Sequence, residues 1–542
     1  MDNPSDTYDA ERIALLLGHR PEAQEYPRLA ADLALTLDGV AHPTVSPATV
    51  QALGQALLTA VDLQRALNHL LRYLGSLSAP QAFWTAVQQH PQALASVVSI
   101  FAGSQFLSSI LWRRPQLLFW LLDGALWATP PTPRALAHGL ERILHGQDAE
   151  AEVGASLRAF TLQHLLRIGA RDLNNLADVE ETTAELSALA DCVIQAGLRA
   201  CQDGLEGTYG QPWYTDDAGQ QHRCHFCVIG MGKLGGYELN FSSDIDLMYV
   251  YTSYQGQTTG VVHEGKLQNQ ISNHEYFVAL ARRLTNILGG KGPDGQAFRV
   301  DLRLRPDGTQ GQLALSLLSY EAYYARLGQT WEKMALLKAR PVAGDQRLGE
   351  EFMDLIQPFI YQRHLDPAGL RQLQAMKQQI DAQIADKDQS RTNVKRGLGG
   401  IREIEFFIQL LQLLFGGRYP ALQERHSLRA LTKLRDAGFI TPQVEATMRQ
   451  TYCYLRRLEH RLQMEQGAQT HTLPRGDAQR LRLARHLGHA TWETFYQDYL
   501  ERTTAVHALF ITAFQGTPTA LAALSSFGAS AGTDVWNTTP TL

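Results

Sequence analysis

The chain of 542 residues contains only five cysteines, and their spacing follows no disulfide framework. They are Cys192, Cys201, Cys224, Cys227 and Cys453. An odd number of cysteines without framework spacing favours a reducing compartment, so we predict a cytoplasmic protein. Cys224 and Cys227 form a lone C-x-x-C that lacks the second pair or the spaced histidines of a zinc site. We therefore predict that both cysteines are structural.

The sequence also lacks a membrane segment and an excess of basic charge. Its most apolar region, "FLSSILWRRPQLLFWLLDGALWA", is broken by Arg113, Arg114, Pro115 and Asp123. A membrane span needs roughly 20 uninterrupted apolar residues, so this region is predicted to form two buried helices. The start, "MDNPSDTYDAER", is acidic and polar, unlike a signal peptide. With a net charge of −5, we expect no membrane and no nucleic-acid partner, and any anion site must be a local pocket.

What the chain does contain is a segment of mixed character between helical blocks. Residues 1–210 carry apolar residues three and four positions apart and are predicted to form a helical N-terminal domain. Residues 211–345 mix strand and helix patterns, beginning with a predicted hairpin in "YGQPWYTDDAGQQHRCHFCVIG". Residues 346–515 are predicted to be helical again, and residues 516–542 to be a flexible tail. The predicted fold is mostly helical α+β.

The stretch "VIGMGKLGGYELNFSSDIDLMYVY" combines four glycines with an Asp-x-Asp pair. Its G-x-G-x-x-G matches a dinucleotide-binding turn, but the next strand arrives at Ser243, too early for a βαβ unit of about 30 residues. A Walker A loop is excluded because Leu234 follows Lys233 where Ser or Thr is required. The glycines therefore belong to another kind of phosphate site.

Asp244 and Asp246 are two positions apart, so on a strand they point to the same face. Two such carboxylates can share a pair of divalent ions that clamp the attacking and leaving oxygens of an in-line displacement. "FRVDLRLRP" is predicted to be a neighbouring strand whose polar face presents Asp301 among arginines, with Phe298, Val300, Leu302 and Leu304 facing the core. The arginines would keep this carboxylate ionised and could hold phosphate oxygens.

Other readings of these acidic residues stay open at this point. Asp-x-Asp is common at solvated strand ends, and it also occurs in glycosyltransferases and metal-dependent phosphatases. An EF-hand is excluded because no glycine or spaced glutamate follows Asp246. The conjunction of Gly-Gly, a short helical turn, Ser-Asp-x-Asp and a later strand Asp favours metal-dependent nucleotidyl or phosphoryl transfer.

Four motifs in this order resemble one known family. They are "GMGKLGGYELNFSSDIDLMYVY", "FRVDLRLRPDGTQGQLALSLLSYEAYY", "TWEKMALLKARPVAGD" and "NVKRGLGGIREIEFFIQLLQLLFGGRYPALQ". From about residue 90 to 515 the chain is similar to the glutamine synthetase adenylyltransferase/deadenylylase family. The resemblance implies a DNA polymerase beta-like nucleotidyltransferase domain set between helical bundles.

Full-length members of this family carry two catalytic domains. The C-terminal one uses ATP to add AMP to a tyrosine of glutamine synthetase, and the N-terminal one removes AMP by attack of inorganic phosphate, which releases ADP. "NFSSDIDL" and "GIREIEF" resemble the adenylyl-removing half, since the other half typically has Asp where Glu403 stands. We expect one catalytic copy, because the sequence after 515 shows no start of a second.

The resemblance implies a role for each matching residue. Asp244, Asp246 and Asp301 are expected to be catalytic and to bind two Mg²⁺ or Mn²⁺ ions. The residues expected to hold the phosphates of ATP, ADP or AMP, or the incoming inorganic phosphate, are Gly235, Gly236, Ser243, Arg303, Arg305, Lys338 and Arg340. Lys233 is a weaker candidate, and for Arg402, Glu403 and Glu405 a buried salt bridge and a site role both remain open.

The implied function is phosphorolytic removal of AMP from glutamine synthetase, under control of the PII signalling protein and glutamine. ATP-dependent adenylylation of the synthetase, alone or with its reversal, is the alternative. A non-catalytic module that senses nucleotide or PII is a second alternative, against which the intact aspartates argue.

Overall fold

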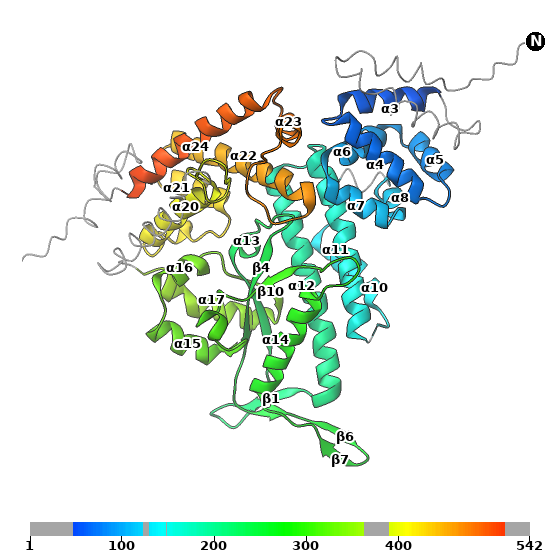
Figure 1. Cartoon of the computed structure of the whole chain (residues 1–542). Coiled ribbons are helices and arrows are strands. Elements are labelled where there is room, and N and C mark those ends of the chain that lie inside the picture. The colour runs from blue at the N-terminus through cyan, green and yellow to red at the C-terminus, as the bar shows by residue number, and fades with distance from the viewer. Residues whose placement is uncertain (1–46, 123–128, 148, 363–389, 515–542) are drawn as a thin grey trace, which may run out of the picture. The chain divides into compact units, whose positions relative to one another are not determined.

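A computed structural model describes residues 47–122, 129–147, 149–362 and 390–514. Helices dominate, and the strands lie in the middle of the chain (Figure 1), as the mostly helical α+β prediction requires. Contacts divide the chain into two compact units, each assembled from distant segments. The first takes the described residues within Met1–Pro131, Leu162–Thr182 and Leu458–Gln497, and the second those within Thr132–Thr161, Thr183–Arg457 and Asp498–Leu542. The linear boundaries at 210, 345 and 515 stay predictions, and the predicted tail at 516–542 lies outside the described residues.

The first unit is helical. Its complete helices are α3 Pro47–Thr59, α4 Leu63–Ser76, α5 Gln81–Gln89, α6 Pro91–Gly103, α7 Gln105–Arg113, α8 Gln116–Leu122 and α23 Asp477–His486. The apolar region around Arg113 forms two separate helices, α7 and α8, as predicted, since Pro115 cannot continue α7. No single described helix is long and apolar enough to cross a membrane; α6 and α7 pass the length and composition test only together, with a bend of 111° between them.

The main sheet of the second unit has the strand order β10-β3-β4-β8, and β9 also pairs with β4. β3 (Phe226–Gly230) runs antiparallel to β4 (Asp244–Tyr251) and to β10 (Arg340–Gly344). β8 (Arg299–Asp301) and β9 (Leu315–Ser316) are parallel to β4. Every residue of β3 is buried, as its continuous apolar sequence indicates.

Helices cover both faces of this sheet. Phe226 of β3 stacks on Phe277 of α14 (Asn273–Gly289), whereas Cys227, the next residue, faces Gly349 of α17 (Gln346–Ile360). Because successive strand residues point to opposite faces, α14 and α17 lie on opposite sides. α14 begins with a capping box of Ser272 and Glu275 and ends before Gly290, as its sequence predicts.

The predicted hairpin is present as β1 (Pro212–Thr215) and β2 (Gln221–Arg223), joined in a separate sheet by β5 (Gln257–Thr258). β6 (Val261–His263) and β7 (Lys266–Gln268) form a second hairpin. Cys224 and Cys227 are buried free thiols, and burial raises the pKa of each to about 12. Both therefore remain protonated, which agrees with a structural role.

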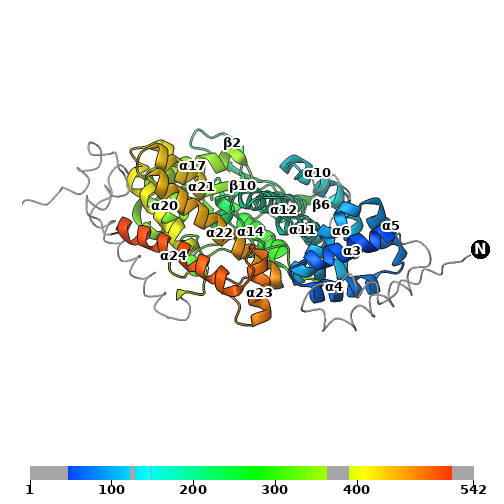
Figure 2. The same cartoon turned by 90° about the horizontal axis from the view of Figure 1, so that it is seen from above.

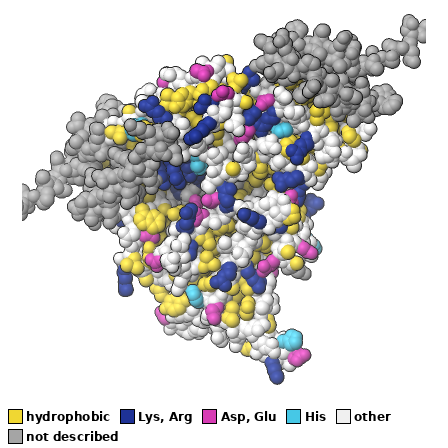
Figure 3. Space-filling model, viewed as in Figure 1, with side chains coloured by type: hydrophobic (Ala, Val, Ile, Leu, Met, Phe, Trp, Pro, Cys, Tyr) yellow, Lys and Arg dark blue, Asp and Glu magenta, His cyan; other side chains and the backbone are white. Residues whose placement is uncertain are grey.

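Three of the remaining helices lie side by side in both views (Figures 1 and 2), namely α20, α21 and α22. Their bounds, with those of the other helices, are α10 Pro133–Leu144, α11 Glu150–Leu173, α12 Val179–Tyr209, α13 Gly232–Gly235, α15 Leu317–Arg326, α16 Thr330–Leu336, α20 Ile401–Phe415, α21 Ser427–Asp436, α22 Pro442–Gln466 and α24 Trp492–Phe514. On the face shown in Figure 3, Lys and Arg side chains are interspersed with acidic, hydrophobic and other side chains.

Candidate active site

The predicted aspartates lie together at one end of the β4–β8 pair. In the parallel register, Asp244 is opposite Arg299 and Asp246 is opposite Asp301. Ile245 between them is fully buried, so Asp244 and Asp246 share the other face of the strand, as the spacing predicts. Asp301 joins them from the neighbouring strand. The register alone therefore brings three carboxylates from two strands to one place.

The strand that carries Asp301 is shorter than predicted. Only Arg299–Asp301 is strand, and the chain then turns. The predicted core face is wrong, because its four apolar residues are half-buried: Phe298, Val300, Leu302 and Leu304. β8 lies at the edge of the sheet order, where a strand has a sheet neighbour on one side only.

Two of the carboxylates have arginine partners. Arg299 Nε donates to Asp244 Oδ1 at 2.6 Å. The Arg303 guanidinium donates through Nε to both carboxylate oxygens of Asp301, at 3.0 and 2.9 Å. These hydrogen bonds lower the pKa of Asp301. Arg303 is itself 72% exposed, so its guanidinium can turn to another anion.

Asp246 has a different environment. Burial, followed by the negative charges of Asp301 and Asp244, raises the pKa of its carboxyl to about 7. Lys395 and Arg303 oppose this rise with their positive charges. Burial and the two neighbouring carboxylates thus oppose the ionisation of Asp246 more strongly than the nearby cations favour it.

We tested whether these residues fit a divalent cation. Among the described residues, no three His, Cys, Asp or Glu side chains already surround one point as metal ligands, since Asp244 and Asp301 turn to their arginines. The donor chemistry nevertheless fits, because Mg²⁺ takes carboxylate oxygens as ligands. A divalent ion would favour the ionised form of Asp246 and could bind Asp301 once Arg303 released it.

The glycine-rich turn contributes one residue that sequence reasoning passed over. Gly232 starts α13 with φ +54°, and a Cβ placed on it would lie 2.6 Å from Asp246 Oδ2. The backbone amide of Met231 donates to the Asp246 carbonyl at 2.8 Å. Only glycine allows the backbone to pass the carboxylate this closely in a left-handed conformation.

The two glycines predicted to hold phosphate lie close to Lys338, which precedes β10. A Cβ on Gly235 would lie 1.9 Å from the Lys338 carbonyl oxygen, and one on Gly236 would lie 2.9 Å from Glu238 Oε2. Close packing alone therefore requires glycine at 235. Ser243 is half-buried and directly precedes Asp244. The phosphate roles of these three residues stay predictions.

The remaining predicted cations already have partners. Arg305 donates to the carbonyl oxygens of Leu302, Thr309, Gly311 and Gln312, which closes its own loop. Lys338 is buried, and its Nζ lies 2.6 Å from Glu238 Oε2 and 2.9 Å from Glu405 Oε1.

Arg340 pairs with Asp191 at 2.8 Å, donates to the Leu234 carbonyl at 3.0 Å and lies over the Tyr237 ring. Lys233 is half-buried on α13. Like Lys338, Arg340 holds the glycine turn in place, and a phosphate role for either residue stays a prediction.

The acidic residues of α20 take part in buried pairs. Glu405 contacts Lys338, and Glu403 accepts from the Gly399 amide at 2.9 Å and lies 2.9 Å from His507 Nδ1. Burial, followed by the charge of Arg396, lowers the pKa of Arg402. The salt-bridge interpretation holds for Glu405, since its partner Lys338 is 92% buried.

The loop of residues 237–243, which leads into Asp244, is held by a buried cluster that sequence reasoning missed. Arg456 of α22 donates to the Glu238 carbonyl at 2.7 Å and to Asn240 Oδ1. The Ser427 amide donates to Glu238 Oε1 at 2.7 Å. Burial opposes ionisation of Glu238, but the charges of Lys338, His426 and Arg456 outweigh it and lower its pKa to about 2.

Lys395 was also missed. It follows Val394 in "NVKRGLGG", just before α20, and its charge acts on Asp246. The Lys-Arg pair beside a Gly-Leu-Gly-Gly turn was a visible signal of a basic loop. That this loop lies near Asp246 could not be predicted from the sequence, because the two segments come together only in the tertiary structure.

Comparison with known families finds two matches. Residues 94–355 match the model of the glutamate-ammonia ligase adenylyltransferase family. Residues 374–514 match the model of the PII-uridylyltransferase family. All three aspartates fall in the first matched region, and Lys395, Ser427 and Arg456 fall in the second.

Curated relatives agree with the first match. The chain is 39% identical over 427 residues to the bifunctional glutamine synthetase adenylyltransferase/adenylyl-removing enzyme of Xanthomonas campestris pv. campestris (strain B100), which covers 79% of this chain and 42% of the relative. The like-named protein of Thioalkalivibrio sulfidiphilus (strain HL-EbGR7) is 37% identical, with 79% and 43% covered. That of Stenotrophomonas maltophilia (strain K279a) is 40% identical, with 77% and 42% covered. The chain spans about half the length of the curated relatives it matches.

Proposed function

The chain belongs to the glutamate-ammonia ligase adenylyltransferase family, and we propose that it removes AMP from the adenylylated tyrosine of glutamine synthetase by phosphorolysis, releasing ADP. The observation that carries the chemistry, transfer at a phosphorus atom, is the pairing of Asp246 with Asp301 across the parallel β4–β8 ladder, with Asp244 on the same face. The resemblance of "NFSSDIDL" and "GIREIEF" to the adenylyl-removing half favours removal over addition. A glycine turn, an Asp-x-Asp strand and a further strand Asp also support a DNA polymerase beta-like nucleotidyltransferase fold for this segment.

The proposed reaction exchanges one phosphorus–oxygen bond for another. An oxygen of orthophosphate attacks the α-phosphorus of AMP–tyrosine, and the bond from phosphorus to the tyrosine oxygen breaks. The products are ADP and tyrosine, whose phenolate takes a proton from water. No protein nucleophile is required, so the site must mainly bring two anions together and stabilise the charge that develops.

The residues divide this task. Asp244, Asp246 and Asp301 would hold Mg²⁺ or Mn²⁺, and a bound ion supplies positive charge at the reacting phosphate. Arg303, exposed beside Asp301, is positioned to hold orthophosphate once it releases the carboxylate. Lys395 adds a second positive charge near Asp246.

The experiment is phosphate-dependent release of ADP from adenylylated glutamine synthetase in the presence of Mg²⁺. We expect Asp244→Asn to lower the rate by about 100-fold or more, because a charge-stabilising group is lost. Asp217→Asn, in the exposed β1–β2 turn, is the matched control and should keep the full rate. Wild-type release by Asp244→Asn would contradict the proposal.

A second candidate is ATP-dependent adenylylation of the synthetase. It is favoured by the names of the relatives, which combine both activities. Transfer of labelled AMP from ATP onto unmodified synthetase by this chain would support it.

We also infer that the PII signalling protein regulates the chain. The support is the match of residues 374–514 to a PII-uridylyltransferase family. Binding of PII or nucleotide without turnover under any condition would instead favour a non-catalytic sensing module.

A further inference from the structure

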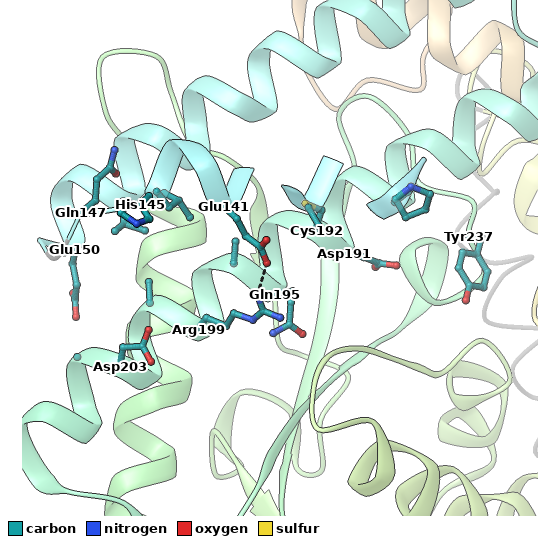
Figure 4. A pocket seen from close by; sticks show the side chains of 18 residues that line it. Glu141, His145, Gln147, Glu150, Asp191, Cys192, Gln195, Arg199, Asp203 and Tyr237 are labelled. Carbon is teal, nitrogen blue, oxygen red and sulfur yellow. Dashed lines mark hydrogen bonds and ion pairs between the residues drawn. The ribbon is translucent and has the colours of Figure 1, made fainter. Parts of the chain in front are cut away.

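The second unit contains a cavity of about 770 Å³ between α10, α11 and α12. This volume is in the range of small-molecule sites, which run from about 300 to 1,000 Å³. None of the aspartates at the candidate active site lines it. Figure 4 shows it as a trough, with Asp191 and Tyr237 at one end and His145, Gln147 and Glu150 at the other.

The sequence explains why the space is there. α12 faces the cavity with small side chains at four-residue intervals: Ala188, Cys192, Ala196, Ala200 and Gly204. Residues four apart lie on the same helix face, so this face offers little bulk to fill the gap. α10 contributes Pro133 and Ala137, also four apart. Apolar walls of this kind fit an aliphatic chain.

The charges along the walls are mostly negative. Four carboxylates line the cavity, whereas Arg199 is its one lining guanidinium, already 2.6 Å from Glu141. Among the described residues Asp203 has no hydrogen-bond or ion-pair partner. The buried Oε1 of Gln147 also lacks a partner. Asp203 is exposed and Gln147 is half-buried. Both groups accept hydrogen bonds, so a ligand that lies along this end of the cavity can donate to them.

Asp191, at the other end, is also short of positive charge. Arg340 holds it through two contacts at 2.8 and 2.9 Å, yet burial raises the pKa of this carboxyl to about 6. An additional cation would favour its ionised form. On α12, Asp191 and Asp203 are separated by 12 residues, about 18 Å along the helix axis. A ligand that is complementary to negative charges spaced along an apolar cavity carries positive charges spaced along an aliphatic chain.

A path of direct contacts leads from this cavity to the aspartates. Arg340, the partner of Asp191, donates to the Leu234 carbonyl at 3.0 Å and stacks on Tyr237, which itself lines the cavity. Leu234 belongs to α13, whose first residue, Gly232, passes Asp246. A ligand that changes the Asp191–Arg340 pair therefore acts on the turn that shapes the active site.

We propose that this cavity binds a linear aliphatic polyamine and that its occupancy acts on the catalytic turn through Arg340. The first statement, the binding half of the proposal, is supported by the cavity itself; the second statement, the effect on the turn, is the coupling half. The coupling half rests on the proposed function.

Calorimetric titration of the full chain with spermidine tests the binding half. We expect saturable binding of one molecule per chain, and none with the neutral hexane-1,6-diol. Ala196→Leu and Ala200→Leu fill the cavity with a good helix former and should weaken binding by at least about tenfold. Asp203→Asn, which removes one exposed charge, should weaken it about threefold to tenfold.

Glu152→Gln is the matched control, because Glu152 is an exposed acid on α11 outside the cavity. It should bind spermidine as the wild type does. Absence of saturable binding, or equal binding by the wild type and both leucine variants, would overturn the site.

The coupling half is read from the rate of adenylyl removal with and without spermidine. A change in kcat or KM in the wild type that disappears in Ala196→Leu supports the coupling, and binding with no change in either constant overturns it. If the chain removes no adenylyl group at all, the proposed function fails, whereas the titration still decides whether the cavity is a site.

Discussion

Asp246 combines burial with two carboxylate neighbours, and this separates it from an Asp-x-Asp pair at a solvated strand end. Asp301 lies opposite it in the parallel ladder, and Asp244 lies two residues away on the same face. Burial and the charges of these two neighbours oppose its ionisation. A divalent cation would supply positive charge and hold the three side chains together.

Asp301→Asn should therefore lower the affinity for metal more than it lowers the stability of the fold. We expect the Mg²⁺ concentration for half-maximal adenylyl removal to rise by more than about tenfold, since one anionic ligand is lost. The exposed Asp307 follows in the same turn, and Asp307→Asn is the control. Unchanged Mg²⁺ dependence in Asp301→Asn would remove this residue from the metal site.

Gly232→Ala tests the close approach of the glycine turn to Asp246. The added methyl would lie 2.6 Å from Asp246 Oδ2, so we expect the carboxylate to move and the rate to fall by about tenfold or more. Gly219→Ala is matched for backbone strain, since Gly219 has φ +80° with nothing near its Cβ position. Each variant should lose about 1 kcal/mol of stability from the left-handed backbone. Equal rates in the two would show that the approach has no functional role.

At this scale, period-two spacing was enough to predict that Asp244 and Asp246 share a face. The arginine partners were not predictable, because Arg299 meets Asp244 only through the register of two strands. The approach of Lys395, far along the chain, also depends on tertiary packing. The assignment of these residues to metal and phosphate stays a prediction.

Among the elements, α22 is connected most directly to the loop before Asp244. Arg456→Met would remove the donors to the Glu238 carbonyl and to Asn240 and leave the buried glutamates with less positive charge. We expect a loss of about 3–5 kcal/mol of stability, together with a lower kcat in the protein that remains folded. The measurement is urea unfolding combined with turnover.

The control is the neighbouring exposed residue, as Arg457→Met. It should change stability by no more than about 0.5 kcal/mol. If Arg456→Met proved equally harmless, the buried cluster would not be holding the loop.

The helical first unit should lose stability as the solution becomes acidic. Burial lowers the pKa of His486 and of His164 to about 3 and that of His69 to about 4. The unfolded chain takes up these protons near pH 6.5, so the folded form is favoured fully above that pH and progressively less from 6.5 down to the folded values. Each histidine contributes up to about 1.4 kcal/mol per pH unit.

His486→Leu isolates one of these terms. Between pH 7 and pH 5, the stability measured by thermal unfolding should fall less steeply in this variant than in the wild type. The difference in slope should correspond to the uptake of one proton on unfolding. Parallel pH profiles for the two proteins would mean that His486 is not kept neutral by burial.

The long helices and the first hairpin were predictable because their signals are local. Three- and four-residue spacing and terminal glycines mark α14 and α20, and the Asp-Asp-Ala-Gly turn marks β1 and β2. β8 was overestimated, because alternating residues in "FRVDLRLRP" continue past the three residues that pair with β4. Alternation shows which residues could form a strand, but here the chain turns after Asp301 although β4 continues to Tyr251.

At the scale of the whole molecule, each compact unit is assembled from segments distant in sequence. The first unit joins residues near 60, 170 and 480, and the second surrounds the sheet with helices from both sides of it in sequence. Composition could indicate three successive blocks but not which helices pack together, since that choice depends on side-chain fit. The family was recognisable because its motifs occur in order, and the match over residues 94–355 confirms it.

The direction of the reaction, addition or removal of AMP, does not follow from the residues of the site. The relatives are named for both adenylylation and its removal, and this chain spans about half their length. The aspartates serve either direction equally well, because both reactions break and form a bond at the same phosphorus.

Radiolabelled orthophosphate, incubated with this chain, Mg²⁺ and adenylylated glutamine synthetase, tests phosphorolysis most directly. Attack by orthophosphate carries its phosphorus into the product, so label should appear in ADP, and Asp244→Asn should prevent its appearance. Release of unlabelled AMP would indicate hydrolysis by water, and either that result or the absence of any nucleotide release would contradict the proposed function.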